Sequence, residues 1–166
     1  MNDQANAQSG SGRELIGAFD RQFASLHSDA AVLVSKTPLE MLYRNMRQST
    51  ALPVHSIGEN VLRSAAAVEQ TFGGITANLW DDPFEWTLPE NLSTVARVIE
   101  YLQEVEATRA RAFASFARDS DLLQEVLVPA GDTRALIDLL VETLVKAADY
   151  LGRASATLLL LSDDRH

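Results

Sequence analysis

The sequence predicts an all-α protein, an up-down four-helix bundle with long inter-helix linkers. Two observations support this prediction: four long stretches repeat apolar residues at helical spacing, and no stretch alternates strictly between apolar and polar residues. The chain has 166 residues, of which 46% are hydrophobic, and this is enough for one domain with a core. We expect a disordered tail over residues 1–12 and a single helical domain over residues 13–166.

The first predicted helix covers residues 12–36 and ends at Thr37-Pro38, because the residue before a proline is pushed out of the helical region. A short helical turn after Pro38 is expected to cover one end of the core. The second helix, residues 56–80, opens on Ser56 and Glu59, which have the spacing of a capping box. Gly73-Gly74 is expected to weaken or kink this helix near its end.

The third predicted helix covers residues 94–116 and is expected to be capped by Ser93. Arg109 lies close to the apolar side of this helix. We expect its aliphatic stem to pack against the core while its charged head reaches solvent; partial burial of the side chain is the alternative.

The fourth predicted helix, residues 133–161, has a wide apolar surface. Asp132 is its expected N-cap, and Gly131 supplies the turn before it. Its polar strip is narrow and consists of Asp138, Glu142, Asp149 and Arg153. A wide apolar arc predicts contact with two neighbours, as in a bundle or at a dimer interface.

The connection after the second helix, DDPFEWTLPEN, is rich in acids and aromatic residues. Trp80, Phe84 and Trp86 are expected to cap the core, or else to form a surface for a partner. The acids are expected to be solvated; a site for a hard cation such as calcium is the alternative. They are Asp81, Asp82, Glu85 and Glu90.

Composition excludes several functions. A formal net charge of −9 argues against nucleic acid or an anionic membrane surface as the main partner. The chain has no cysteine, and hence neither a disulfide framework nor a thiolate metal site. No apolar run approaches the ~18 residues of a spanning helix, and the first residues lack the apolar segment of a signal peptide. We expect a cytoplasmic protein.

Three stretches resemble the DinB-like superfamily of bacterial four-helix bundles. TPLEMLYRNM resembles the segment before the family's second helix, SIGENVLRSAAAVEQTFGG resembles that helix, and DLLVETLVKAADYLGRASATLLLL resembles the last helix. The resemblance covers residues 13–161 and includes the Gly152-Arg153 pair, which stands where the family pattern has Gly-Gln after two histidines. It implies a homodimer, and in family members with intact sites a divalent metal held by three histidines for thiol-dependent transfer or isomerisation.

Carried over residue by residue, the resemblance places the last-helix histidines at Lys146 and Tyr150, and the second-helix histidine at Arg63 or Ser64. Helical geometry favours Ser64, because Arg63 points nearly away from the apolar stripe. Protonated lysine and arginine are not ordinary metal ligands, and serine and neutral tyrosine are poor ones. The only histidines are His27, His55 and His166, and none has a helical partner at three or four residues. We therefore expect no metal and no cofactor.

Three hypotheses about function remain open. The first is a metal-free DinB-like homodimer that binds a small ligand or a partner protein, with Lys146 exposed and paired to Glu142 as a favourable i, i+4 pair. The second is an enzyme for an anionic substrate, in which Lys146, Tyr150 and Ser64 or Arg63 converge in one pocket as a binding or acid/base site. The third is a metalloenzyme with displaced ligands, drawn from His55, Glu59, Glu142 and Asp149.

Overall fold

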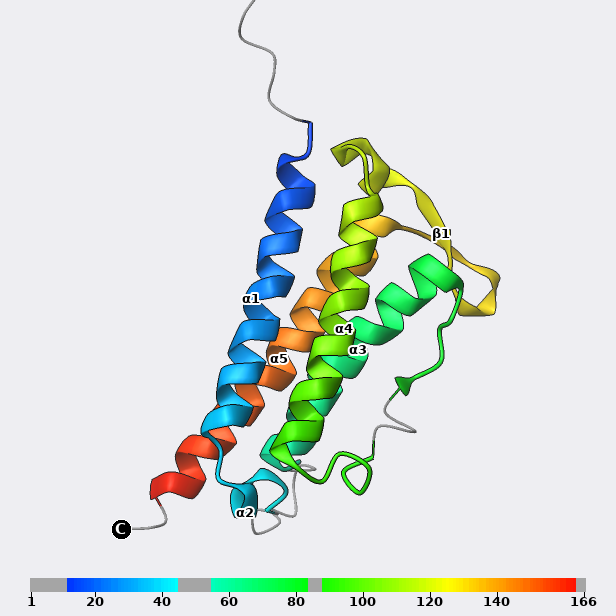
Figure 1. Cartoon of the computed structure of the whole chain (residues 1–166). Coiled ribbons are helices and arrows are strands. Elements are labelled where there is room, and N and C mark those ends of the chain that lie inside the picture. Colours follow the sequence, from blue (N-terminus) through cyan, green and yellow to red (C-terminus); the bar gives the residue numbers. More distant parts are fainter. Residues whose placement is uncertain (1–11, 45–54, 84–87, 164–166) are drawn as a thin grey trace, which may run out of the picture.

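The structure, a computed structural model, describes residues 12–44, 55–83 and 88–163. Four long helices lie side by side (Figure 1): α1 (Glu14–Lys36), α3 (Ile57–Ala77), α4 (Val95–Ser115) and α5 (Leu136–Asp163). The all-α class is confirmed, apart from one small sheet. The predicted tail over residues 1–12 falls outside the described residues except for Gly12, and so do His166 and the segment from residue 45 to residue 54.

Short elements connect the helices. They are α2 (Leu39–Leu42), the 3-10 helices η2 (Asp119–Leu123) and η3 (Pro129–Gly131), and the strands β1 (Glu125–Leu127) and β2 (Thr133–Ala135). The strands pair antiparallel, with Val126 opposite Arg134. The prediction that α5 begins at Thr133 with Asp132 as its N-cap is therefore wrong. Residues 133–135 pair with β1 instead, and Gly131, at a φ of +83°, makes the turn that allows this pairing.

The helices form a ring in which α1 packs on α4, α4 on α3, α3 on α5, and α5 on α1; α3 and α5 share the most extensive contact. Contacts at the two ends show the helix directions. Tyr43, which follows α1 and the short α2, donates a hydrogen bond from its hydroxyl to the Leu92 carbonyl just before α4, at 2.6 Å. At the opposite end, Asp119 accepts hydrogen bonds from the amides of Leu15 and Ile16.

α1 and α4 are therefore antiparallel. Ser64 and Thr71 of α3 meet Ala147 and Thr143 of α5, so that α3 and α5 are also antiparallel. α3 and α4 run in the same direction, and the long connection between them returns to the starting end (Figure 1). This corrects the up-down prediction, because direction does not alternate between α3 and α4. The length of that connection is the physical reason, since parallel neighbours need a crossover.

The core lies at the centre of the ring, where the apolar stripes of the four helices meet. Three phenylalanine rings from three different helices, Phe23, Phe72 and Phe113, touch there with centroids 5.3 to 5.8 Å apart. Edge and tilted arrangements of this kind are favourable between aromatic rings. None of the helices in the described part of the chain is long and apolar enough to cross a membrane.

The start of α3 follows the prediction. The Glu59 amide donates to Ser56 Oγ at 3.2 Å, and the Ser56 amide donates to Glu59 Oε2 at 2.8 Å, which completes the capping box. At the start of α4 the predicted cap is wrong by one residue. Thr94, not Ser93, accepts the hydrogen bond from the Arg97 amide, at 3.2 Å. Either hydroxyl suits an N-cap, so the sequence alone could not separate them.

Candidate functional site

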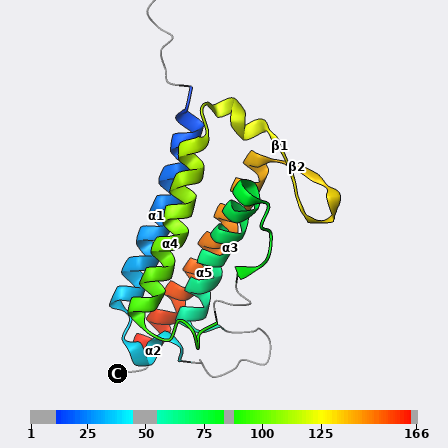
Figure 2. The same cartoon turned by 45° about the vertical axis from the view of Figure 1, so that its right-hand side comes forward.

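A polar hollow of about 210 Å³ opens where α3 and α5 meet the strand pair. Figure 2 shows the two strands projecting beyond the end of α3, over the outer side of that seam. α3, α5 and the connections on either side of α4 all contribute to the lining. The residues that line it are Ala67, Gln70, Thr71, Trp80, Val128, Pro129, Arg134, Leu139, Glu142, Thr143 and Lys146. We call this the α3–α5 hollow.

One wall of the α3–α5 hollow is Trp80, and the end of α3 positions it. α3 stops at Ala77, and Asn78 takes the left-handed conformation, with a φ of +56°. The chain then folds back over the helix, and a Cβ at Gly74 would overlap the indole ring of Trp80. Gln70 fixes the turn by donating to the Trp80 carbonyl at 2.8 Å. Gly74 is thus needed so that Trp80 can pack closely on the helix.

One prediction about this end is therefore wrong, because the helix does not continue to Trp80. The paired glycines, expected to weaken or kink the helix, lie in its last turns and serve its termination and the close packing of Trp80. The Gly73 carbonyl accepts the hydrogen bond from the Leu79 amide at 3.1 Å, which closes the C-terminal turn. Phe84, Trp86 and Glu85 lie outside the described residues, so the prediction for the aromatic cluster is tested for Trp80 alone.

The floor of the α3–α5 hollow carries two buried hydroxyls. Thr71 Oγ1 and Thr143 Oγ1 lie 2.6 Å apart, and Thr143 Oγ1 also donates to the Leu139 carbonyl at 2.7 Å. A hydroxyl has only one proton to donate, so Thr71 is the donor between the two. Both protons are consumed within the protein, and the floor offers acceptor lone pairs in a polar environment.

The charged groups at the mouth are Arg134, Glu142 and Lys146. Arg134 Nη1 and Glu142 Oε2 form an ion pair at 2.6 Å. Lys146 is exposed, as the first hypothesis predicted, but it makes no ion pair with Glu142, although both residues lie within the described part of the chain. That part of the prediction is wrong because β2 brings Arg134 to Glu142 first. With two cations and one acid, the mouth has a local charge of +1 in a chain of net charge −9.

The other three predicted site residues do not line the α3–α5 hollow. Ser64 is buried and donates to the Ala147 carbonyl at 2.8 Å, so its hydroxyl joins α3 to α5. It borders a separate space of about 30 Å³ between α1, α3 and α4, room for about one water. Arg63 lies one turn before Ala67, and Tyr150 one turn after Lys146, so both lie along the same seam outside the hollow.

The four residues of the second hypothesis are thus divided between different surroundings. Tyr150 is half-buried, with the Arg153 guanidinium 5.6 Å from the centre of its ring. Arg153 also pairs with Asp149 at 2.6 Å, as the i, i+4 spacing predicts. Lys146 is the only one of the four that lines the α3–α5 hollow.

The carboxylates of the third hypothesis do not converge either. Among residues 12–44, 55–83 and 88–163, no group of three or more His, Asp or Glu side chains is placed to hold a metal ion. Glu59 belongs to the capping box. Burial of its carboxylate acts against ionisation, but the hydrogen bonds from Ser56 outweigh this effect, and the pKa of Glu59 lies below its ordinary value.

The structure buries one charged group more deeply than the sequence predicted. Arg109 is only 4% exposed, and its guanidinium binds Asp20 of α1 and Glu106 of α4, the latter at 2.6 and 2.8 Å. The prediction that its head reaches solvent is therefore wrong. Burial acts to lower the pKa of Arg109, but the hydrogen bonds that it donates to both acids raise it, so the charge is held firmly. The i, i+3 spacing of Glu106 and Arg109 was the available signal.

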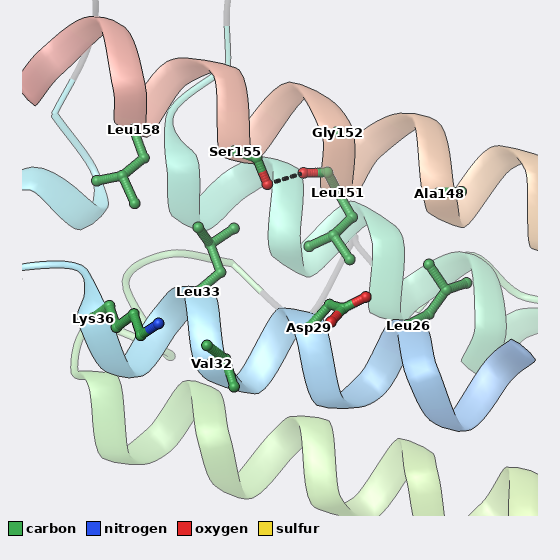
Figure 3. Close-up of a pocket in the computed structure, with 10 residues that line it drawn as sticks. All are labelled: Leu26, Asp29, Val32, Leu33, Lys36, Ala148, Leu151, Gly152, Ser155 and Leu158. Carbon is green, nitrogen blue, oxygen red and sulfur yellow. Dashed lines mark hydrogen bonds between the residues drawn. The ribbon is translucent and has the colours of Figure 1, made fainter. Parts of the chain in front are cut away.

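A third depression, about 500 Å³ and largely open, runs between α1 and α5 (Figure 3). Its walls are mostly apolar, with Leu26 and Leu33 on the α1 side and Leu151 and Leu158 on the α5 side. It contains none of the predicted site residues. We call it the α1–α5 groove.

Comparison of the chain with family models, with curated proteins and with solved structures found no match in any of the three.

Proposed function

We propose that this protein is a binding module for a small anionic ligand, held in the α3–α5 hollow by Lys146 and Arg134. The observation that supports this proposal is the local charge of +1 at a concave, polar place on a chain of net charge −9. The chain has only two lysines, and one of them stands at this mouth. Fixed cations in a concave site concentrate field lines and attract anions.

The lining indicates the chemistry of the ligand. Lys146 offers an ammonium group as a compact point charge, which suits a carboxylate or a phosphate equally well. The indole of Trp80 offers an apolar face for the rest of the ligand. A volume of about 210 Å³ is below the ~300–1,000 Å³ of drug-sized sites, so the ligand is a small one.

The wider proposal keeps the first hypothesis from the sequence. The protein is a metal-free, four-helix DinB-like bundle that acts in the cytoplasm as a homodimer. The resemblance of the three sequence stretches supports this proposal, and so does the packing of four long helices around one core. Catalysis on an anionic substrate and a metal site with displaced ligands stay alternatives from sequence alone. Ser64 and Tyr150 do not line the hollow with Lys146, and His55, Glu59, Glu142 and Asp149, all within the described part of the chain, do not form a group placed to hold a metal ion.

Thermal melting with and without anionic probes tests the ligand proposal. The probes are inorganic phosphate, acetate, and an aromatic carboxylate such as benzoate. At least one is expected to raise the melting temperature of the wild-type protein, because a ligand that binds the folded state stabilises it by mass action. Lys146→Ala is expected to remove this shift. Lys36→Ala is the matched control, since Lys36 is an exposed lysine on α1 outside the hollow.

The outcome that supports the proposal is a shift that survives in Lys36→Ala and is lost in Lys146→Ala. A shift of equal size in both variants would place the anion elsewhere and contradict the proposal. The absence of a shift with all three probes would also contradict it. Tryptophan fluorescence gives an independent readout, because Trp80 borders the hollow.

A further inference from the structure

α5 carries a stripe of uncharged residues on its solvent side. They recur at alternating spacings of four and three residues, and all are exposed; Val145 reaches 64% and Leu159 68%. The members are Val141, Val145, Ala148, Gly152, Ser155 and Leu159. We call them the outer stripe. Val141 and Ala148 are apolar and exposed, so part of the wide apolar surface of this helix remains uncovered by the chain's own helices.

The outer stripe is separate from the side of α5 that enters the core. Leu140, Ala147 and Ala154 are fully buried against the other helices. Residues of the stripe project away from them, and a spacing of four and three residues is the one with which helices pack along a seam. At ~1.5 Å per residue the stripe is about 27 Å long. Such a continuous uncharged row on the surface of a charged protein is typical of an interface.

The centre of the outer stripe is small. Glycine in a helix interior costs about 1 kcal/mol relative to alanine. At Gly74 the close approach of Trp80 accounts for the glycine, but a Cβ at Gly152 would have nothing within 4 Å of it. The chain itself therefore gives no reason for glycine at 152. A helix from another molecule that crosses α5 closely at Ala148 and Gly152 would give one.

We infer that the outer stripe is the homodimer interface, in which α5 of one copy crosses α5 of a second copy in the antiparallel direction about a two-fold axis near position 150. The stripe is symmetric about that position. The axis brings Val141 opposite the partner's Leu159, Val145 opposite the partner's Ser155, and Ala148 opposite the partner's Gly152. Large residues thus meet at both ends of the contact and small ones at the crossing. The same surface of each copy is used, which is the definition of an isologous contact.

The charged residues beside the outer stripe of one copy are complementary to those of the second copy in the same antiparallel arrangement. Asp149 and Arg153 form a pair within each helix at 2.6 Å and are placed symmetrically about position 151, one residue from the proposed axis. An axis near position 150 therefore brings each acid to within about 3 Å, measured along the helix, of the partner's Arg153. This local complementarity favours a second copy as the occupant, because it offsets at this surface the repulsion between two chains of net charge −9.

The α1–α5 groove continues this surface. Ala148, Gly152 and Ser155 belong both to the outer stripe and to the lining of the groove (Figure 3). On the α1 side, Val32 is 46% exposed and extends the apolar area beyond α5. The contact therefore does not depend on one helix pair alone.

Sedimentation of the full chain over a wide concentration range gives the first test. This inference rests on the homodimer part of the proposed function, and we expect wild type to have twice the chain mass. Ala148→Arg places a charge at the crossing and is expected to give the single-chain mass. Ala110→Arg, the same change at an exposed alanine of α4, is the matched control and is expected to remain dimeric. Circular dichroism checks that both variants are folded.

Crosslinking tests the direction of the helices, since the natural chain has no cysteine to interfere. A short thiol crosslinker is expected to join Val141→Cys protein to Leu159→Cys protein when the two are mixed. Neither variant alone is expected to crosslink, because in the antiparallel arrangement equivalent positions lie about 27 Å apart along the helix.

The outcomes separate the two claims. A wild-type chain that stays monomeric overturns both the homodimer and this interface, while ligand binding in the α3–α5 hollow is measured independently. A dimer that survives Ala148→Arg, or that crosslinks within each single variant and not in the mixture, overturns the interface and leaves the homodimer standing.

Discussion

Two cationic regions of this molecule differ in how their charge is used. Between α1 and α4, Arg109 is 4% exposed, and two carboxylates bind its guanidinium. Between α3 and α5, Lys146 is exposed at the mouth of a hollow, where Arg134 is already paired with Glu142. The first region contains two acids for one base, and the second contains two bases for one acid.

The difference separates structural charge from charge that can bind a ligand. A buried guanidinium with its donors occupied by the protein joins two helices and has little left for another molecule. A cation at a concave, water-filled place can exchange its water for an anionic ligand. Both regions are built by residues from distant parts of the sequence, so neither is visible as a compact motif.

The largest expected effect on stability comes from removing the buried ion pairs of Arg109 between α1 and α4. Arg109→Ala leaves Asp20 and Glu106 without their shared partner and removes a buried side chain. We expect a loss of about 3 kcal/mol in the free energy of unfolding, at the low end for a broken buried pair because the Asp20 side chain is 47% exposed and can regain water. Urea denaturation measures this loss.

Arg111→Ala on the same helix is the control for that experiment. Arg111 is exposed and donates to Thr108 Oγ1 at 3.1 Å, so its removal is expected to change the free energy of unfolding by less than about 0.5 kcal/mol. Equal losses in the two variants would mean that the buried ion pairs contribute no more than a surface arginine does.

The second effect concerns Trp80, which forms one wall of the α3–α5 hollow. Gly74→Ala places a methyl group where the indole of Trp80 lies, and we expect a loss of about 1–3 kcal/mol together with a shift in tryptophan emission. In the Trp80→Ala background the same glycine change is expected to cost little, because the ring that it would overlap is gone. Additive losses in this double-mutant cycle would show that the contact does not explain the glycine.

Much of the fold could be predicted from the sequence, since four amphipathic stretches and a capping box are local signals. The predicted bounds of the four helices were right to within a few residues. The two largest differences, at the start of α5 and the end of α3, arise where a tertiary contact sets the helix end. α5 begins three residues later than its helical pattern, because residues 133–135 pair with β1. α3 ends three residues before Trp80, because Gly73 and Gly74 allow the chain to fold back on the helix.

Less of the candidate site could be predicted. Lys146 was identified through the resemblance, but its companions Arg134 and Trp80 reach the hollow only through the strand pair and the turn after α3. The turn signal was present in the proline, glycine and aspartate of residues 129–132, next to β-branched residues. Ser64 lies on the predicted buried side of its helix, but spacing could not show that its hydroxyl is consumed by the Ala147 carbonyl.

Glu59 is intermediate in burial between Arg109 and Lys146, and its Oε2 accepts hydrogen bonds from the amide and the hydroxyl of Ser56. Its pKa is depressed in the folded protein, so its carboxylate stabilises the fold above the unfolded-state pKa of about 4.3, and this stabilisation is lost as the pH falls through the folded-state pKa. We expect Glu59→Gln to lose about 0.5–1 kcal/mol at pH 7 and to match wild type at the acidic end.

Urea denaturation at a series of pH values measures this dependence, with Glu104→Gln, an exposed position on α4, as the control. A Glu59→Gln loss that is the same at every pH would mean that the charge of the cap contributes nothing beyond its hydrogen bonds.

The smallest effect on stability is expected from Glu142→Gln. This substitution removes the one acid at the mouth of the α3–α5 hollow and so tests directly whether the charge there binds an anion. Arg134 and Glu142 form an exposed ion pair, so its loss is expected to change the free energy of unfolding by less than about 0.5 kcal/mol. The same substitution raises the charge at the mouth from +1 to +2. The anionic probes are therefore expected to bind about two- to fivefold more tightly, and this gain is expected to shrink as salt is added.

Isothermal titration of the tightest-binding probe at low and high salt measures the gain. Unchanged affinity would mean that the bound anion does not sense the charge at this mouth. Weaker binding would mean that Glu142 is needed to hold Arg134 toward the ligand, and the hollow would then resemble the Arg109 region more than the proposal allows. Tighter probe binding by Glu142→Gln together with lost probe binding by Lys146→Ala is the pair of results that assigns the anion to the α3–α5 hollow.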